Sequence, residues 1–214
     1  MEFPHLVRLI EENQFDTIYH EHFSYLSFTT TEQIFRIHGL KLFDVERLPT
    51  HGGSLRIFAC HAGNQSQPVS QSVEDLRKEE EAWGIRKLER YWEFAHKVEI
   101  TRRTILRFFV EAKDRKRTIA GYGAPGKGNT LLNYCGIRPD LLDYTVDRNS
   151  YKQGKFTPGT RIPIYSPAKI RETKPKFLFI LPWNLKDELM EQNAFIREWG
   201  GQFVVPIPEV KVNN

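Results

Sequence analysis

The sequence predicts an α/β protein whose C-terminal part folds as a Rossmann-like parallel sheet with flanking helices. Short apolar runs at residues 118–123, 144–146, 177–181 and 203–206 alternate with helix-like segments at 129–134, 167–173 and 185–199. Strands that alternate with helices along a chain pair in parallel through right-handed crossovers. A glycine-rich turn also follows the first run, where dinucleotide-binding folds place theirs.

The composition and hydrophobic pattern of the chain divide the residues before this domain into two regions. We expect residues 1–67 to form an N-terminal segment of helices and a β-hairpin, and residues 68–116 to form a charged helical connector. Residues 117–214 then form the Rossmann-like domain.

The N-terminal segment opens with a short amphipathic helix that has Leu6, Leu9 and Ile10 on one face. A second helix is predicted to begin with Thr30 or Thr31 as its N-cap and to end at Gly39. Its inward residues are expected to be Ile34, Phe35 and Ile37. Residues 40–48 and 54–61 alternate like two strands on either side of residues 49–53.

Apolar residues recur through the connector at helical spacing, and Gly84 is the expected bend. We expect the charged face of this helical region to be solvated.

Composition excludes several classes of protein. No apolar run approaches the roughly 20 residues that a membrane span needs. The charged start does not resemble a signal peptide, so we expect a cytoplasmic protein. The net charge is only +4, and the signatures of RNA-binding and zinc-finger domains are absent, which argues against nucleic acid. Cys60 and Cys135 lie among apolar residues and are expected to be buried thiols.

The glycine-rich turn spans residues 121–130 and suits a phosphate or diphosphate. Gly121, Gly123 and Gly126 match the G-x-G-x-x-G spacing, and Asp147 follows near where a ribose-binding acid would lie. Lys127 adds a positive charge that a dinucleotide site does not need. The loop lacks the Gly-Lys-Ser/Thr ending of a Walker A motif. A plain strand–helix turn and an NAD(P)-dependent oxidoreductase both remain open alternatives.

The segment Tyr19-His20-Glu21-His22 has the residue types for acid–base chemistry. A histidine titrates near neutral pH, and a neighbouring carboxylate can orient it. If the segment is extended, Tyr19 and Glu21 share one face and the two histidines share the other; in a loop all four residues could converge. Two histidines without a third ligand do not predict zinc. Histidines packed in an aromatic loop are the structural alternative.

Five stretches, in order, resemble one family. They are FDTIYHEHFSY at residues 15–25, HGGSLR at 51–56, GYGAPGKGNT at 121–130, YTVDRNSYKQGKFTPGT at 144–160 and LPWNL at 181–185. The chain resembles the C-terminal domain of S-adenosylmethionine-dependent sugar-nucleotide C-methyltransferases, and is similar to the dTDP-4-keto-6-deoxyhexose C-3-methyltransferases.

The resemblance implies that residues 117–214 bind a nucleotide-diphosphate sugar. It implies that His22 is the base that removes a proton next to the keto group, with Glu21 and Tyr19 in support. The substrate-binding residues are then expected to be Gly123, Gly126, Lys127, Asn129, Asp147, Lys155 and Trp183.

The family's enzymes also have a zinc-binding domain and a central domain that holds S-adenosylmethionine. Neither a cysteine-rich segment nor a glycine-rich donor strand precedes Tyr19. We therefore expect this chain to supply half of an active site, with the donor domain separate or missing and S-adenosylmethionine not bound here. A non-catalytic sugar-nucleotide-binding module is the main alternative.

Overall fold

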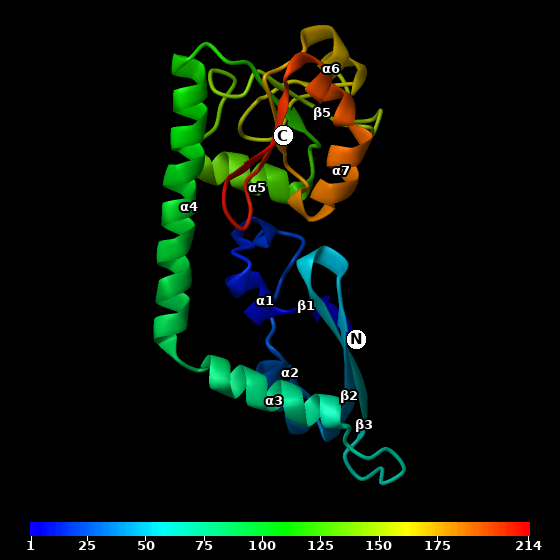
Figure 1. Ribbon diagram of the computed structural model, residues 1–214. Helices are drawn as coiled ribbons and strands as arrows, with labels where there is room; N and C mark the ends of the chain where they lie inside the picture. The colour runs from blue at the N-terminus through cyan, green and yellow to red at the C-terminus, as the bar shows by residue number, and fades with distance from the viewer. The chain divides into compact units, whose positions relative to one another are not determined.

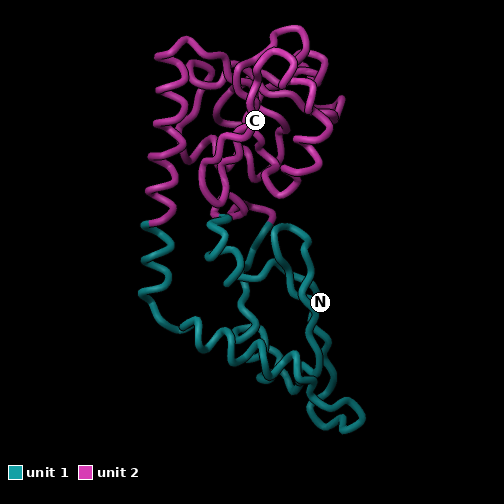
Figure 2. The backbone as a smooth tube through the Cα atoms, in the orientation of Figure 1, with its two compact units in different colours: residues 1–14, 22–96 teal, residues 15–21, 97–214 magenta.

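A six-stranded sheet forms the centre of the larger part of the protein. The computed structural model describes all 214 residues, and spatial contacts gather them into two units (Figure 2). Unit 1 contains Met1–Gln14 and His22–His96, and unit 2 contains Phe15–Glu21 and Lys97–Asn214. The units follow long-range contacts, whereas the three expected regions followed composition along the chain.

The sheet of unit 2 has the strand order β6-β5-β4-β7-β8-β9. Its strands are β4 (Ile119–Tyr122), β5 (Tyr144–Val146), β6 (Ile164–Tyr165), β7 (Phe177–Ile180), β8 (Gln202–Val205) and β9 (Lys211–Asn213). All pair in parallel except β9, which is antiparallel to β8. Numbered along the chain, this is the doubly wound order 3-2-1-4-5-6. The predicted Rossmann-like sheet is confirmed.

The parallel strands are mostly apolar because helices cover both faces of the sheet. In β7, Phe179 contacts Phe109 of α4 (Leu88–Asp114), with ring centroids 5.0 Å apart. Leu178 and Ile180 alternate to the other face and join a core with α6 (Ala168–Thr173), α7 (Lys186–Gln192) and η4 (Ala194–Trp199) (Figure 1). The period of two along a strand thus assigns its residues to two cores.

Unit 1 has a three-stranded antiparallel sheet in the order β1-β3-β2. The strands β2 (Leu40–Leu48) and β3 (Ser54–His61) form the predicted hairpin. The short strand β1 (Glu2–Pro4) was not expected and pairs with β3. Phe28 of α2 (Phe28–Ile37) and Val73 of α3 (Gln71–Trp83) close the core over this sheet. The predicted first helix is α1 (Leu6–Glu11).

Two expectations for α2 are wrong. The N-cap lies three or four residues earlier than predicted because Ser27, rather than a threonine, accepts the backbone N–H of Thr30 at 3.0 Å. Ile34 and Ile37 are exposed, at 43% and 71%, and only Phe35 packs against the core. The earlier start places Phe28 and Thr31 on the inner face of the helix.

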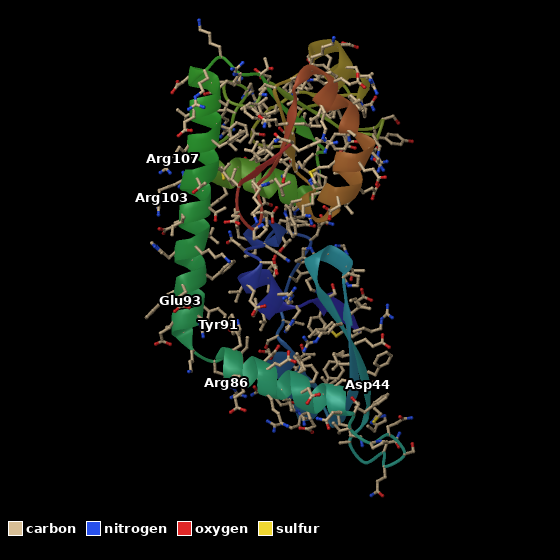
Figure 3. All side chains as sticks on the ribbon, in the orientation of Figure 1. Asp44, Arg86, Tyr91, Glu93, Arg103 and Arg107 are labelled. Carbon is tan, nitrogen blue, oxygen red and sulfur yellow. The ribbon has the colours of Figure 1, made fainter.

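The connector folds as α3 and α4, and Gly84 ends α3 in the left-handed conformation, with φ +87°. Next to this bend, Tyr91 donates its hydroxyl to the carbonyl of Ile85 at 2.6 Å. Further along α4, Arg103 and Arg107 extend from the side that faces away from the sheet (Figure 3). None of the helices combines the length and apolarity needed to cross a bilayer. Cys135 is buried as expected, but Cys60 is only half-buried.

Candidate functional site

The candidate site lies where the strand order of unit 2 reverses. The chain leaves β4 toward β5 on one side, while β7 begins the series on the other. In open α/β sheets, ligands bind at the carboxyl ends of the strands at such a switch point. Gly123 follows β4 with φ +85°, and a Cβ there would lie 2.8 Å from Cδ of Pro182, which follows β7. Only glycine fits where these two loops meet.

The helix α5 (Gly126–Cys135) begins directly after this loop. Its N-cap is Pro125, and no side chain caps its first turn. The first amides of a helix have no partner within the helix, and the helix dipole adds positive potential there. The N-terminus of α5 therefore has the properties of an anion site.

Lys127 lies on this first turn within a group of four side chains. Its ammonium group is 4.5 Å from the centre of the Trp183 ring and donates to Oδ1 of Asn184 at 2.7 Å. Beneath it, the indole Nε1 of Trp183 donates to Oδ2 of Asp16 at 2.7 Å. Lys127 is thus held over an aromatic face whose own orientation is set by a carboxylate.

Asp16 is fully buried, with 0% of its surface exposed. Burial raises the pKa of Asp16 to about 7, against the opposing effects of the Trp183 hydrogen bond and the charge of Lys127. Its other oxygen, Oδ1, is buried without a hydrogen-bond partner. Burial likewise lowers the pKa of Lys127, and the charge of Asp16 opposes that shift. The two groups therefore share a poorly solvated region, where electrostatic interactions are strong.

Tyr19 approaches the same helix end. A Cβ placed on Gly126 would lie 3.0 Å from Cε2 of Tyr19, so the glycine permits this close approach. The segment η1 (Phe15–Thr17), which precedes Tyr19, packs on α5 through Phe15 and Tyr134, with ring centroids 5.3 Å apart. Tyr19 and the glycine-rich turn, which lie far apart in the sequence, thus meet at one helix end.

Asp147 occupies a supporting position at the end of β5. Its Oδ2 accepts the amide of Ala124 at 2.8 Å and the ammonium group of Lys152 at 3.2 Å, while Oδ1 accepts the amide of Asn149. Burial would raise the pKa of Asp147, but these hydrogen bonds and the charge of Lys152 outweigh it and hold the pKa below its usual value. Lys152 also donates to the carbonyl of Ala124 at 2.9 Å. This pair fixes the shape of the glycine loop.

The other predicted residues are less closely gathered. Asn129 lies on α5, and its Oδ1 is buried without a partner. Lys155 is exposed on the loop after β5. The chain bends at Tyr19 and turns at His20 and Glu21, so the segment is not an extended strand. Glu21 is exposed and belongs to unit 2, whereas His22 belongs to unit 1, where its ring lies 6.2 Å from that of Tyr25.

The site residues expected from the sequence do not include Asp16, Lys152 or Asn184. Asp16 had a recognisable signal, since it is a lone carboxylate among apolar and aromatic neighbours at residues 15–19. Such a residue is rarely buried without a specific partner. Lys152 and Asn184 are polar residues in polar loops, and nothing local distinguishes them from solvated ones.

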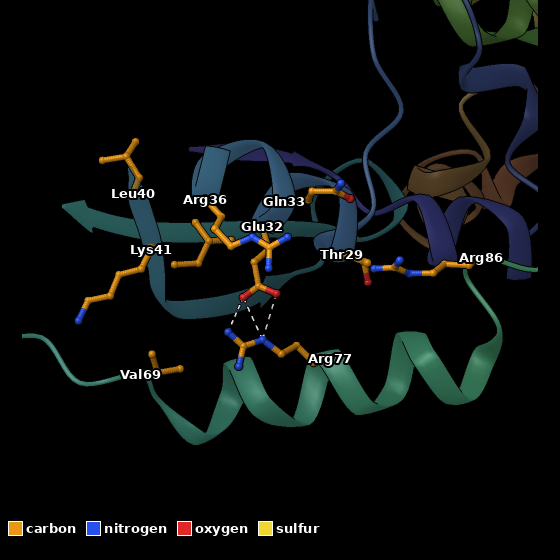
Figure 4. A pocket seen from close by; sticks show the side chains of 10 residues that line it. Thr29, Glu32, Gln33, Arg36, Leu40, Lys41, Val69, Arg77 and Arg86 are labelled. Carbon is orange, nitrogen blue, oxygen red and sulfur yellow. Dashed lines mark hydrogen bonds and ion pairs between the residues drawn. The ribbon is translucent and has the colours of Figure 1, made fainter. Parts of the chain in front are cut away.

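Unit 1 contains a pocket of about 370 Å³ between α2, β2 and α3. Arg36, Lys41, Arg77 and Arg86 contribute positive charge to its lining (Figure 4). However, the guanidinium group of Arg77 already binds the carboxylate of Glu32 through Nε at 2.9 Å, and also pairs with Glu74. The Arg77–Glu32 ion pair therefore connects α3 to α2, and the charge of Arg77 is already neutralised within the chain. No group of three or more metal-ligating side chains gathers anywhere in the protein.

The fold and the loop define unit 2 as a Rossmann-like α/β domain with an uncapped helix N-terminus at its switch point. Residues 49–208 match the family described as the C-methyltransferase C-terminal domain. The match covers most of the chain, and the chain belongs to this family. The resemblance noted from the motifs is confirmed.

A curated relative extends this comparison. The chain is 40% identical over 212 residues to the C-methyltransferase NovU of Streptomyces niveus. The alignment covers 99% of this chain and 50% of the relative. The chain therefore spans about half the length of that relative.

Proposed function

We propose that this chain is the substrate-binding and catalytic-base half of an S-adenosylmethionine-dependent C-methyltransferase that acts on a nucleotide-linked 4-keto-deoxysugar. The observation that carries the proposal is the uncapped N-terminus of α5 with Lys127 held above it at the switch point. The diphosphate of a nucleotide sugar has the charge and size for that position.

The chain's own chemistry is the removal of a proton. A keto group makes the hydrogen on the neighbouring carbon acidic, and His22 accepts this proton as the general base. Glu21 supports His22, and Tyr19 donates a hydrogen bond to the keto oxygen as it gains negative charge. These three roles rest on the family motif. The position of Tyr19 beside Gly126 supports its part, because Gly126 begins the proposed diphosphate site.

S-adenosylmethionine supplies the methyl group in the proposed intact enzyme. The glycine loop of unit 2 does not suit this donor, because the donor carries a sulfonium cation and both Lys127 and the start of α5 are positive. Asp147, the acid at the position of a ribose-binding residue, already uses both oxygens within the chain. The same observation argues against an NAD(P)-dependent oxidoreductase.

Binding is tested by calorimetry with thymidine diphosphate and, separately, with S-adenosylmethionine. We expect the diphosphate to bind and the methyl donor not to bind. Lys127→Gln should weaken diphosphate binding about tenfold or more, whereas Lys78→Gln, an equal change of charge at an exposed lysine of α3, should not. Binding of the donor without the diphosphate would overturn the proposal.

The base is tested by exchange of the substrate's hydrogen into heavy water. With a nucleotide-linked 4-keto-6-deoxyhexose, we expect exchange next to the keto group that is lost in His22→Asn. His20→Asn is the matched control, since His20 lies in the same segment and is exposed. A chain that binds the diphosphate but catalyses no exchange would instead be a non-catalytic binding module.

A further inference from the structure

We infer that Asp16 is a positioning residue that holds Lys127 in place for an anionic ligand, acting through the indole ring of Trp183. The inference rests on the proposed diphosphate site and adds the residue that sets its geometry. Asp16 makes no hydrogen bond or ion pair with Lys127; its one hydrogen bond from another side chain comes from Trp183 at 2.7 Å.

The geometry forms a chain of three contacts. Asp16 Oδ2 accepts the indole N–H, which fixes the rotation of the Trp183 ring. The face of that ring then lies 4.5 Å from the ammonium group of Lys127. A cation is attracted to the face of an indole ring, so the ring's orientation determines where the ammonium group rests.

Asn184 supplies the other restraint on Lys127, through a hydrogen bond of 2.7 Å. A lysine side chain has four rotatable bonds, and fixing them costs conformational entropy each time a ligand binds. The ring face and Asn184 hold the ammonium group in advance. Such preorganisation increases affinity without any new contact to the ligand.

Packing alone does not account for a carboxyl group at this position. An apolar residue would fill the buried space without leaving Oδ1 unpartnered, as it is in Asp16. Burying a carboxylate costs free energy. Proteins keep such a buried group mainly where function requires it. The charged and titratable groups that act on Asp16, or reach it through its neighbours, are Lys127 and Cys135 of α5 and Arg102 of α4.

The test is a double-mutant cycle, read out as the affinity for inorganic pyrophosphate. Asp16→Ala should weaken binding about five- to tenfold in the wild-type background. When Lys127→Gln is already present, adding Asp16→Ala should weaken binding no further, because Asp16 acts through Lys127. Asp16→Asn keeps an oxygen that can accept the indole N–H and should remain within about twofold of the wild type. Trp183→Phe, which removes that N–H, repeats the cycle if Asp16→Ala does not fold.

The outcomes separate this inference from the proposed function. Equal weakening by Asp16→Ala in both backgrounds would show a general structural role and overturn the inference, as would an unchanged affinity. If the wild type does not bind pyrophosphate, or if Lys127→Gln binds as tightly as the wild type, the proposed anion site itself fails.

Discussion

Replacing Asp16 by asparagine should change how the stability of this protein depends on pH. Burial raises the pKa of Asp16 from its ordinary value of 3.8 to about 7. A carboxyl group of this kind binds its proton more tightly in the folded state than in the unfolded state. Its contribution to stability is therefore fully present below pH 3.8 and is lost as the pH rises through 7.

The magnitude follows from the size of the shift. Each unit of pKa corresponds to about 1.4 kcal/mol, so the wild type should lose roughly 2 to 3 kcal/mol between pH 5 and pH 8.5 through Asp16 alone. Asn at position 16 carries no charge and loses nothing over this range. The N–H groups of the asparagine amide replace the unpartnered oxygen and lower the free energy of unfolding by about 1 to 3 kcal/mol. That cost is the same at both pH values.

The assay is urea unfolding of the wild type and Asp16→Asn at pH 5 and at pH 8.5. We expect the variant to gain about 2 to 3 kcal/mol relative to the wild type on going to the higher pH. Asp140→Asn is the control, because Asp140 is exposed and should give no such gain. A difference between wild type and Asp16→Asn that stays constant within about 0.5 kcal/mol would refute the reasoning.

Three further predictions concern stability, each measured by urea unfolding. Glu80→Gln should cost about 2 to 4 kcal/mol at pH 7, because buried Glu80 accepts His5 Nε2 at 2.8 Å and the amide of Phe28 at 2.7 Å. Burial would raise the pKa of Glu80, but these hydrogen bonds and those from Thr29 lower it, so the contribution of the ionised carboxylate is lost as the pH falls below the usual 4.5. An effect of Glu80→Gln that is as large at pH 3 as at pH 7 would contradict this. Gly123→Ala should cost about 1 to 3 kcal/mol through its positive φ and the contact with Pro182, whereas Gly63→Ala, which meets nothing within 4 Å, should be nearly neutral. Phe109→Ala should cost about 3 to 5 kcal/mol by leaving a cavity against the sheet. Val110→Ala, at the half-exposed neighbouring residue, should cost much less.

Local patterns predicted the elements that local forces determine. The strands β2 and β3 and the bend at Gly84 lie where alternation and glycine chemistry placed them. The apolar runs of unit 2 correspond to β4, β5, β7 and β8 within a residue or two. In contrast, β1, β6 and β9 contain only two or three residues each and exist because a neighbouring strand pairs with them. Pairing of that kind leaves little signal in the segment itself.

The exposed face of α2 has a related cause. Ile34 and Ile37 suggested an inward face, but the position of a helix on its sheet is set by all of its contacts together. Phe28 and Thr31 are the residues that reach the core. Apolar periodicity determines that a helix has a favoured face, and packing then determines which face is buried.

The sequence by itself determined the Rossmann-like class, the glycine loop, Lys127 and the family, because these depend on residue types at short spacing. The tertiary structure alone decided that η1 docks on α5 and that Asp16 is buried beneath Trp183, 167 residues further along the chain. The pKa of a carboxyl group depends on the solvent and charges around it, and these come from segments distant in sequence. The candidate site could therefore be proposed from the sequence, but the contact between Asp16 and Trp183 could not.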